Sequence, residues 1–186
     1  MSDWNRETAE WYAEKYGEYA TNRLGIDEID FVDDAVVIDI GCGTGAALRH
    51  AASKMTKGRF IGVDPVPRMV EIANEQTENH TAQEKIEYRV GSAESLPVDD
   101  DIANYVLAFD TIDHWQDVEK GLLEVRRVIK ASGVFTIVKD QGVFGASKAA
   151  KILAKKLESA GFWIEVTKQI SKEDVEFYLV VCRVGN

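Results

Sequence analysis

The stretch Val36-Val37-Ile38-Asp39-Ile40-Gly41-Cys42-Gly43-Thr44-Gly45 decides the predicted fold. Its first half is a short β-branched run, which is typical of a strand buried in a sheet. Its second half places three glycines at alternate positions, where they allow a tight turn and a close approach of the backbone to a ligand. A helical pattern follows, and its inner side carries Ala46, Ala47, Leu48, Ala51, Ala52 and Met55. The stretch therefore predicts a strand–turn–helix unit.

The alternation of short apolar runs with helical patterns continues along the chain. Further strands are predicted at 60–63, 86–90, 105–109 and 134–138, and further helices at 69–73, 118–129 and 146–160. Strands that are hydrophobic throughout are typical of a parallel sheet covered on both faces. The last two runs, 162–166 and 177–181, have no room for a helix between them and are predicted to form an antiparallel hairpin. The predicted fold class is α/β, a doubly wound, seven-stranded, mostly parallel sheet with an antiparallel C-terminal hairpin.

The segment before the first strand is predicted to be helical over residues 3–24, with Gly17 as a break. Aromatic residues recur in it at mostly helical spacing: Trp4, Trp11, Tyr12, Tyr16 and Tyr19. One interpretation is a helix that packs this aromatic stripe on the domain. The other is a lid over a binding site. We expect a single domain, 1–186, made of this N-terminal helical segment, 1–24, and a core, 35–184.

Composition excludes several classes of partner. The 186 residues include 22 basic and 32 acidic side chains, and the net charge of −10 repels polyphosphate. No apolar stretch approaches the roughly 20 residues that span a bilayer, and residues 1–7 lack the pattern of a secretory signal. Two cysteines, Cys42 and Cys182, do not make a disulfide framework and indicate a reducing compartment. We expect a cytoplasmic protein that binds neither membrane nor nucleic acid.

The glycine turn is predicted to hold a small ligand, because the helix start that follows presents unpaired N–H groups and a positive dipole end. The alternative is that the glycines serve the turn alone. A P-loop is excluded, since no Lys-Ser/Thr pair follows. Gly41-x-Gly43-x-x-Ala46 with Asp64 downstream also satisfies the dinucleotide pattern, so an NAD(P)-dependent oxidoreductase is a second hypothesis. The closing hairpin argues against it, because a dinucleotide fold normally continues with further βαβ units.

Five blocks, in order, resemble the class I S-adenosylmethionine-dependent methyltransferases of the small, generic methyltransferase-domain type. The blocks are 37–45, Gly62-Val63-Asp64 with Met69 behind it, 91–97, Asp113-His114-Trp115, and 124–133. The resemblance covers about 36–184 and implies a Rossmann-like methyltransferase fold. It also implies S-adenosyl-L-methionine as cofactor, S-adenosyl-L-homocysteine as product and, with the compact acidic chain, a small-molecule acceptor.

The resemblance also implies roles for individual residues. The glycine turn would contact the methionine part of the cofactor, and Asp39 would orient its amino group. Asp64 would accept hydrogen bonds from the ribose, the alternative being a helix N-cap ahead of Pro65. Ala93 and its flanking residues would line the adenine, with Met69 packing on the ring. The complete cofactor-binding set is Asp39, Gly41, Cys42, Gly43, Gly45, Asp64, Pro65, Met69, Ser92, Ala93, Glu94 and Phe109.

Two positions depart from the family, which commonly has acids where Ser92 and Asn104 stand. These departures and the aromatic stripe support a third hypothesis, a non-catalytic domain that keeps cofactor affinity and acts by contacting another protein. The methyltransferase hypothesis remains the main one.

Catalytic candidates follow the fourth predicted strand, at the edge where open α/β sheets bind ligands. Asp110 would give the acceptor site an acidic character suited to an amine or cationic acceptor. His114 is suited to take a proton near neutral pH, and its alternative role is to scaffold the loop. Asp110, Asp113 and His114 are too loose a cluster to predict a metal, so we expect none. A homodimer would supply a wall of the acceptor site that the short chain lacks.

Overall fold

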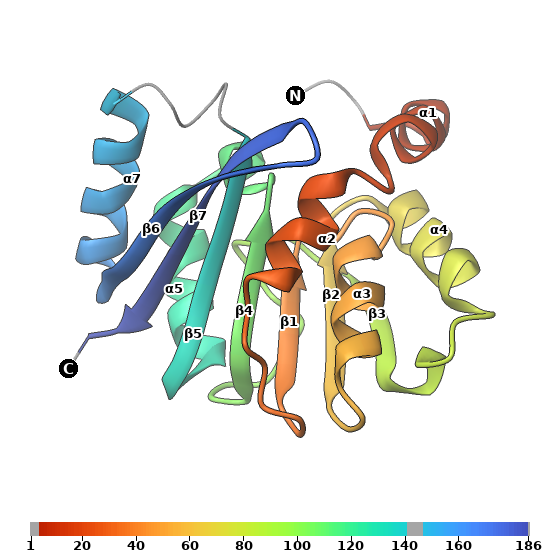
Figure 1. Cartoon of the computed structure of the whole chain (residues 1–186), viewed down its shortest axis with the longest axis horizontal. Coiled ribbons are helices and arrows are strands. Elements are labelled where there is room, and N and C mark those ends of the chain that lie inside the picture. Colours follow the sequence, from red (N-terminus) through yellow and green to blue (C-terminus); the bar gives the residue numbers. More distant parts are fainter. Residues whose placement is uncertain (1–3, 141–146, 186) are drawn as a thin grey trace.

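The computed structural model describes residues 4–140 and 147–185, without the side chains of residues 140, 147 and 148. Within these ranges, one seven-stranded sheet has the order β3-β2-β1-β4-β5-β7-β6 (Figure 1). Its strands are β1 (Val36–Ile40), β2 (Arg59–Asp64), β3 (Ile86–Val90), β4 (Ala103–Phe109), β5 (Ile129–Asp140), β6 (Phe162–Lys172) and β7 (Val175–Val184). Strands β1 to β5 pair in parallel, and β7 pairs antiparallel with both β5 and β6. The predicted fold class is confirmed.

Helices cover both faces of the sheet. They are α1 (Arg6–Tyr16), α2 (Ala20–Asp27), α3 (Ala46–Lys54), α4 (Pro67–Thr77), α5 (Val118–Val128) and α7 (Ser147–Ser159), with short 3-10 turns η1 (Gln83–Lys85) and η2 (Ile112–His114). Figure 1 shows α2, α3 and α4 in front of the sheet and α5 behind it. In the part of the chain that the structure describes, no helix is both long and apolar enough to cross a membrane.

Each face of the sheet has its own apolar core. Val37 of β1 packs with Leu24 of α2 and Leu48 of α3, whereas the next residue, Ile38, packs with Leu122 of α5 on the other face. Successive side chains of a strand point to opposite faces, so a strand covered on both sides must be apolar at every position. This is why β1 contains almost no polar residue.

Three expectations need correction. Burial throughout is wrong for β3, whose residues are half-buried and whose Val90 is 51% exposed, because β3 forms an edge of the sheet. The fifth strand begins at Ile129 rather than at 134, directly after α5. The first two residues of the polar stretch at 171–174 belong to β6, which leaves a two-residue turn at Glu173 and Asp174 with φ of 51° and 61°, as tight hairpins require.

Gly17 breaks the N-terminal helical segment as predicted. Gly17 is the C-terminal cap of α1, where its N–H donates the last helical bond to the Ala13 carbonyl, and α2 then runs from Ala20 to Asp27, beyond the predicted end. A methyl carbon on Gly17 would lie 2.8 Å from Thr44 Cγ2, so the break also brings this segment close to the glycine turn. Residue 3, the start of the helix predicted at 146 and the side chain of Asp140 lie outside the described residues.

Asn104 has a structural role. Its Oδ1 accepts from the Val36 N–H of β1 and from Lys130 Nζ of β5, both at 3.0 Å. The residue thereby connects the central strand of the sheet to both neighbours. This departure from the family pattern lies away from the glycine turn, at the amino end of β1.

Candidate functional site

The glycine turn between β1 and α3 needs glycine for its backbone conformation. Gly41, Gly43 and Gly45 have φ of 73°, 53° and 79°, a region that L side chains rarely adopt. The Gly41 N–H donates to the Val63 carbonyl of β2 at 2.7 Å, and the Gly45 N–H donates to the Cys42 carbonyl at 2.8 Å. The turn is therefore held in shape by its own main chain.

The three glycines have different surroundings. A methyl carbon on Gly41 would lie 2.0 Å from Thr111 Oγ1, and one on Gly45 would lie 2.1 Å from the Tyr88 hydroxyl oxygen. A methyl carbon on Gly43 would meet no described atom within 4 Å. Side chains from the loop after β4 and from β3 therefore pack against the first and third glycines, and the second faces open space that a ligand can enter.

Two buried carboxylates belong to this region: Asp39 precedes the turn at the end of β1, and Asp64 contacts Gly43. Asp39 is 2% exposed, and its Oδ1 has no hydrogen-bond partner among the described residues. Asp64 Oδ2 accepts from the Gly43 N–H at 3.0 Å. Burial, and then the neighbouring Asp64, raises the pKa of Asp39 to about 7, and burial also raises the pKa of Asp64. Such a pair favours a ligand that brings positive charge or hydrogen-bond donors.

The alternative that Asp64 is a helix N-cap is wrong. The N-cap of α4 is Val66, with Pro67 as the first helical residue. Asp64 Oδ1 does accept from the Val66 N–H at 2.9 Å, so this carboxylate fixes the loop before α4 and the glycine turn together. Pro65, between them, is exposed.

The other predicted cofactor residues are only partly brought together. Cys42 is buried with its sulfur close to Gly62, and burial raises the pKa of its thiol well above the ordinary value. Met69 packs with Ala9 between α1 and α4. The ring of Phe109 lies against Gly25 of α2, in the core on that face.

The predicted adenine-side residues lie on the loop after β3. Ser92 and Ser95 form an isolated bridge, which folds the loop back on itself, and Ala93 is buried in the core. Glu94 Oε1 accepts from the Asp117 N–H at 3.1 Å, at the start of α5. Glu94 therefore orders the loop by a defined contact.

A charged cluster follows the carboxyl end of β4. Asp110 has φ of 52° and accepts from Thr21 Oγ1 of α2 at 3.1 Å. Lys139 Nζ lies 2.8 Å from Asp113 Oδ1 and 3.7 Å from Asp110 Oδ1. His114, the other catalytic candidate, has a side chain that is 72% exposed, with Nε2 4.0 Å from Asp113 Oδ1.

Sequence reasoning missed Lys139. Its side chain is 5% exposed and belongs to β5, on the same face as Phe135 and Ile137. A lysine on the buried face of a strand is unusual unless it is paired, and this placement could have indicated that Lys139 has a partner. The strand predicted from the sequence ended at residue 138, so it did not include Lys139.

Helix α1 lies next to this site. Thr44 Oγ1 donates to the Gly17 carbonyl at 2.8 Å, and Ala9 is fully buried against α4. Burial, and then Asp110, raises the pKa of Tyr12, with Asp64 and Asp113 adding to the effect. Tyr12 is thus within electrostatic reach of carboxylates from both the glycine turn and the loop after β4.

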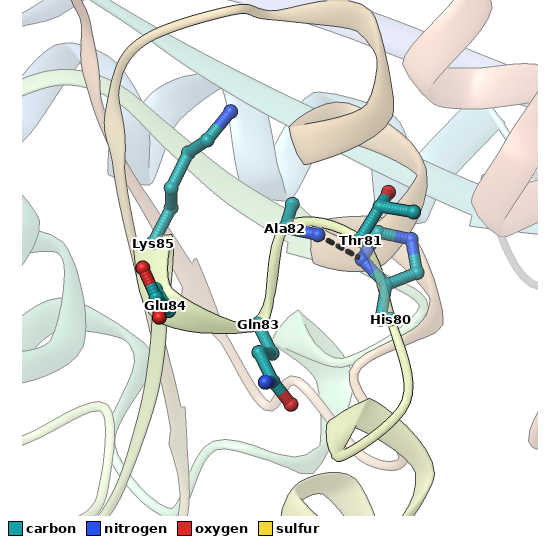
Figure 2. A pocket seen from close by; sticks show the side chains of 6 residues that line it. All are labelled: His80, Thr81, Ala82, Gln83, Glu84 and Lys85. Carbon is teal, nitrogen blue, oxygen red and sulfur yellow. Dashed lines mark hydrogen bonds between the residues drawn. The ribbon is translucent and has the colours of Figure 1, made fainter.

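A separate hollow at the other end of the sheet is not this site. Figure 2 shows it lined by His80, Thr81, Ala82, Gln83, Glu84 and Lys85, with the Ala82 N–H donating to His80 Nδ1 at 3.1 Å. These residues precede β3, whereas the glycine turn follows β1, and the two strands run in the same direction. The hollow therefore lies at the opposite edge, where α/β sheets do not usually bind ligands.

Comparison with known proteins identifies the family. Residues 38–137, more than half of the 186-residue chain, match a family model described as "Methyltransferase domain". An uncharacterized methyltransferase, YcgJ of Bacillus subtilis, is 36% identical over 104 residues, which are 55% of this chain and 39% of that protein. Ajmaline N-methyltransferase of Rauvolfia serpentina is 33% identical over 102 residues, 55% of this chain and 34% of that enzyme. The chain thus spans well under two thirds of either relative.

The fold is shared with solved structures. The structure of a SAM dependent methyltransferase from Aquifex aeolicus is similar to this one, with a TM-score of 0.81 at 17% sequence identity. The similarity covers 97% of this chain and 98% of that chain. The family model matches more than half of the chain, and the sheet order is the one these solved methyltransferases share, so we conclude that the chain belongs to the family described as "Methyltransferase domain".

Proposed function

We propose that this protein transfers the methyl group of S-adenosylmethionine to a small-molecule acceptor. The observation that carries the proposal is the open main chain at Gly43 beside Asp39, a buried carboxylate with an oxygen that no described residue satisfies. The cofactor carries an ammonium group that fits this carboxylate and ribose hydroxyls that fit Asp64. The residues present therefore fit the group that the family binds.

The chain's own contribution is to hold and orient the cofactor. The glycine turn would receive its amino-acid part, Asp39 its ammonium group, Asp64 its ribose, and the loop around Ala93 its adenine. When bound, the cofactor supplies an electrophilic methyl group on a sulfonium, so the protein needs chiefly to position an acceptor and exclude water.

A nicotinamide dinucleotide fits this site less well. Its pyrophosphate would lie at the glycine turn, where Asp39 and Asp64 are buried and would repel it. The sheet also closes with the β6–β7 hairpin instead of further βαβ units. Calorimetric titration with S-adenosylmethionine and with NADH decides between the two, and binding of NADH alone would overturn the proposal.

Gly43→Ala is the sharpest test of where the cofactor binds. The variant should lose about 1 kcal/mol of stability through its positive φ, but cofactor affinity should fall at least about 30-fold because the methyl group enters the ligand's space. Gly45→Ala is the matched control, since its methyl group would meet Tyr88 and should reduce the melting temperature more. Equal cofactor affinity in Gly43→Ala and wild type, by calorimetry, would contradict the placement.

Asp64→Ala tests the ribose contact. Loss of a charged acceptor should weaken cofactor binding by about 1.5–3 kcal/mol, which is roughly 10- to 150-fold in the dissociation constant. Asp99→Ala removes the same charge from an exposed position on the loop before β4 and should leave binding unchanged. A dissociation constant for Asp64→Ala within twofold of wild type would refute the assignment.

We further propose that α1, within the N-terminal segment 1–24, acts as a lid on the core, 35–184. The proximity of Tyr12 to carboxylates of the site and the contact between Thr44 and Gly17 support this role over simple packing.

We place the enzyme in the cytoplasm on its two free, buried cysteines, which suit a reducing compartment. Release of S-adenosylhomocysteine with a metabolite panel separates an enzyme from a non-catalytic domain that only binds the cofactor.

A further inference from the structure

Arg49 of α3 is a largely buried cation that joins three other parts of the chain. Its side chain is 11% exposed. Nη1 donates to the Thr44 carbonyl of the glycine turn at 2.5 Å. Nη2 donates to the Glu18 carboxylate, between α1 and α2, and to Gln76 Oε1 of α4 at 3.1 Å. A guanidinium presents five N–H groups in one rigid plane, so a single arginine can hold several acceptors at once.

Thr44 supplies a second contact between the glycine turn and the N-terminal segment. It is 4% exposed, and its hydroxyl donates to the Gly17 carbonyl at 2.8 Å. Because Gly17 and Glu18 are consecutive, the chain before α2 is held twice, once by the Thr44 hydroxyl and once by Arg49. Thr44 itself follows Gly43, whose main chain faces open space. The N-terminal segment is thus bonded to the residue next to the predicted ligand position.

These contacts lie at the junction of a firmly packed helix and a weakly packed one. Leu24 and Ile26 of α2 belong to the large core on that face of the sheet. Ala9 of α1, in contrast, packs with Met69 and Ile72 of α4 in a small buried cluster (Figure 1). An element with few buried apolar contacts opens at low cost in free energy. The polar contacts at the junction therefore have a large influence on how tightly α1 stays closed.

We propose that Arg49 is a positioning residue that couples closure of α1 to cofactor binding at the glycine turn. The inference rests on the proposed function and names how its site is regulated. A ligand at Gly43 fixes the main chain of the turn, and with it the Thr44 carbonyl that orients Arg49 toward Glu18. Coupling between two sites is reciprocal. A closed α1 therefore raises cofactor affinity by the same factor by which the cofactor favours closure.

The alternative is that Arg49 only stabilises the fold. Loss of its side chain would then lower the melting temperature and leave the dissociation rate of a bound ligand unchanged. Coupling, in contrast, predicts faster dissociation in a protein that is still folded, because α1 opens more often over the bound ligand. The dissociation rate therefore separates the two roles.

The test measures dissociation of S-adenosylhomocysteine from the full chain by surface plasmon resonance. Arg49→Gln should raise the dissociation rate at least about fivefold, the lower end of usual couplings. The control is Arg59→Gln, which removes an arginine that pairs with Glu87 at 2.6 Å at the start of β2, on the opposite edge of the sheet, and should leave the rate unchanged. An unchanged rate in a folded Arg49→Gln variant would overturn this inference alone. Failure of the wild-type protein to bind S-adenosylhomocysteine would instead overturn the proposed function.

Glu18→Gln tests the same contact from its exposed side. The Glu18 side chain is 73% exposed, so the substitution should leave folding intact. It should raise the dissociation rate about threefold, and the double variant with Arg49→Gln should dissociate no faster than Arg49→Gln alone, because both substitutions remove one contact.

Hydrogen exchange reports closure of α1 directly. S-adenosylhomocysteine should slow exchange of the α1 amides at least about fivefold in wild type and less than about twofold in Glu18→Gln. Equal protection of α1 in the two proteins, or no protection in a wild-type protein that binds the ligand, would overturn the inference.

Discussion

Replacing Asp39 with asparagine is expected to stabilise the ligand-free protein and to weaken its binding of S-adenosylmethionine. Burial and Asp64 raise the pKa of Asp39 from an ordinary 3.8 to about 7 in the folded state. The folded protein therefore holds this proton more tightly than the unfolded chain does. The corresponding stability is fully present below about pH 4 and is lost as pH rises through 7. Asparagine does not ionise, so at pH 8 the variant should be more stable by roughly 2–4 kcal/mol.

Urea denaturation at pH 4.5, 6 and 8 measures this effect. Wild type should lose stability across the series more steeply than Asp39→Asn. Parallel pH dependence in the two proteins would show that Asp39 ionises normally. Because the cofactor's ammonium group favours the ionised carboxylate, cofactor binding to wild type should release protons near pH 7 and tighten as pH rises. Calorimetry in two buffers of different ionisation enthalpy detects the proton release, which Asp39→Asn should abolish.

Lys139→Met is expected to destabilise the folded protein strongly. It removes a buried ammonium group that lies beside both Asp110 and Asp113 and leaves these two carboxylates close together. Removing one partner of a buried ion pair usually costs about 3–5 kcal/mol, and partial exposure of the aspartates should reduce this to about 2–4 kcal/mol.

The matched variant is the double substitution Lys139→Met with Asp113→Asn. It removes one of the two repelling charges together with the ammonium group and should recover at least about 1 kcal/mol by urea denaturation. Full additivity of the two single substitutions would show that Lys139 and Asp113 are not coupled.

The sequence predicts the local units of this fold well because they depend on neighbouring residues. The β-branched run at 36–40 and the glycines after it form a strand and turn through their own conformational preferences. The absence of room for a helix between β6 and β7 predicts their antiparallel pairing. The exposure of β3 depends on its position at the edge of the sheet. That position follows from the strand order, which the residue pattern of a single strand does not predict.

Contacts between distant residues are what the sequence could not show. Lys139 meets Asp113 because β4 and β5 are neighbours in the sheet and end at the same edge. The aromatic spacing in α1 is equally consistent with packing and with a lid, and only the three-dimensional structure shows that Tyr12 packs against the cluster of Ala9, Met69 and Ile72. The role of Asn104 in joining three strands likewise appears only in the assembled sheet.

The bracing of the glycine turn has a consequence for binding thermodynamics. Thr111 and Tyr88 pack closely against its first and third glycines, and Asp64 accepts a hydrogen bond from the N–H of the second. Little conformational entropy is then left for this loop to lose when a ligand arrives, so a larger share of the contact energy appears as affinity. The backbone amides of 41–45 should therefore exchange slowly with deuterium even in the ligand-free protein.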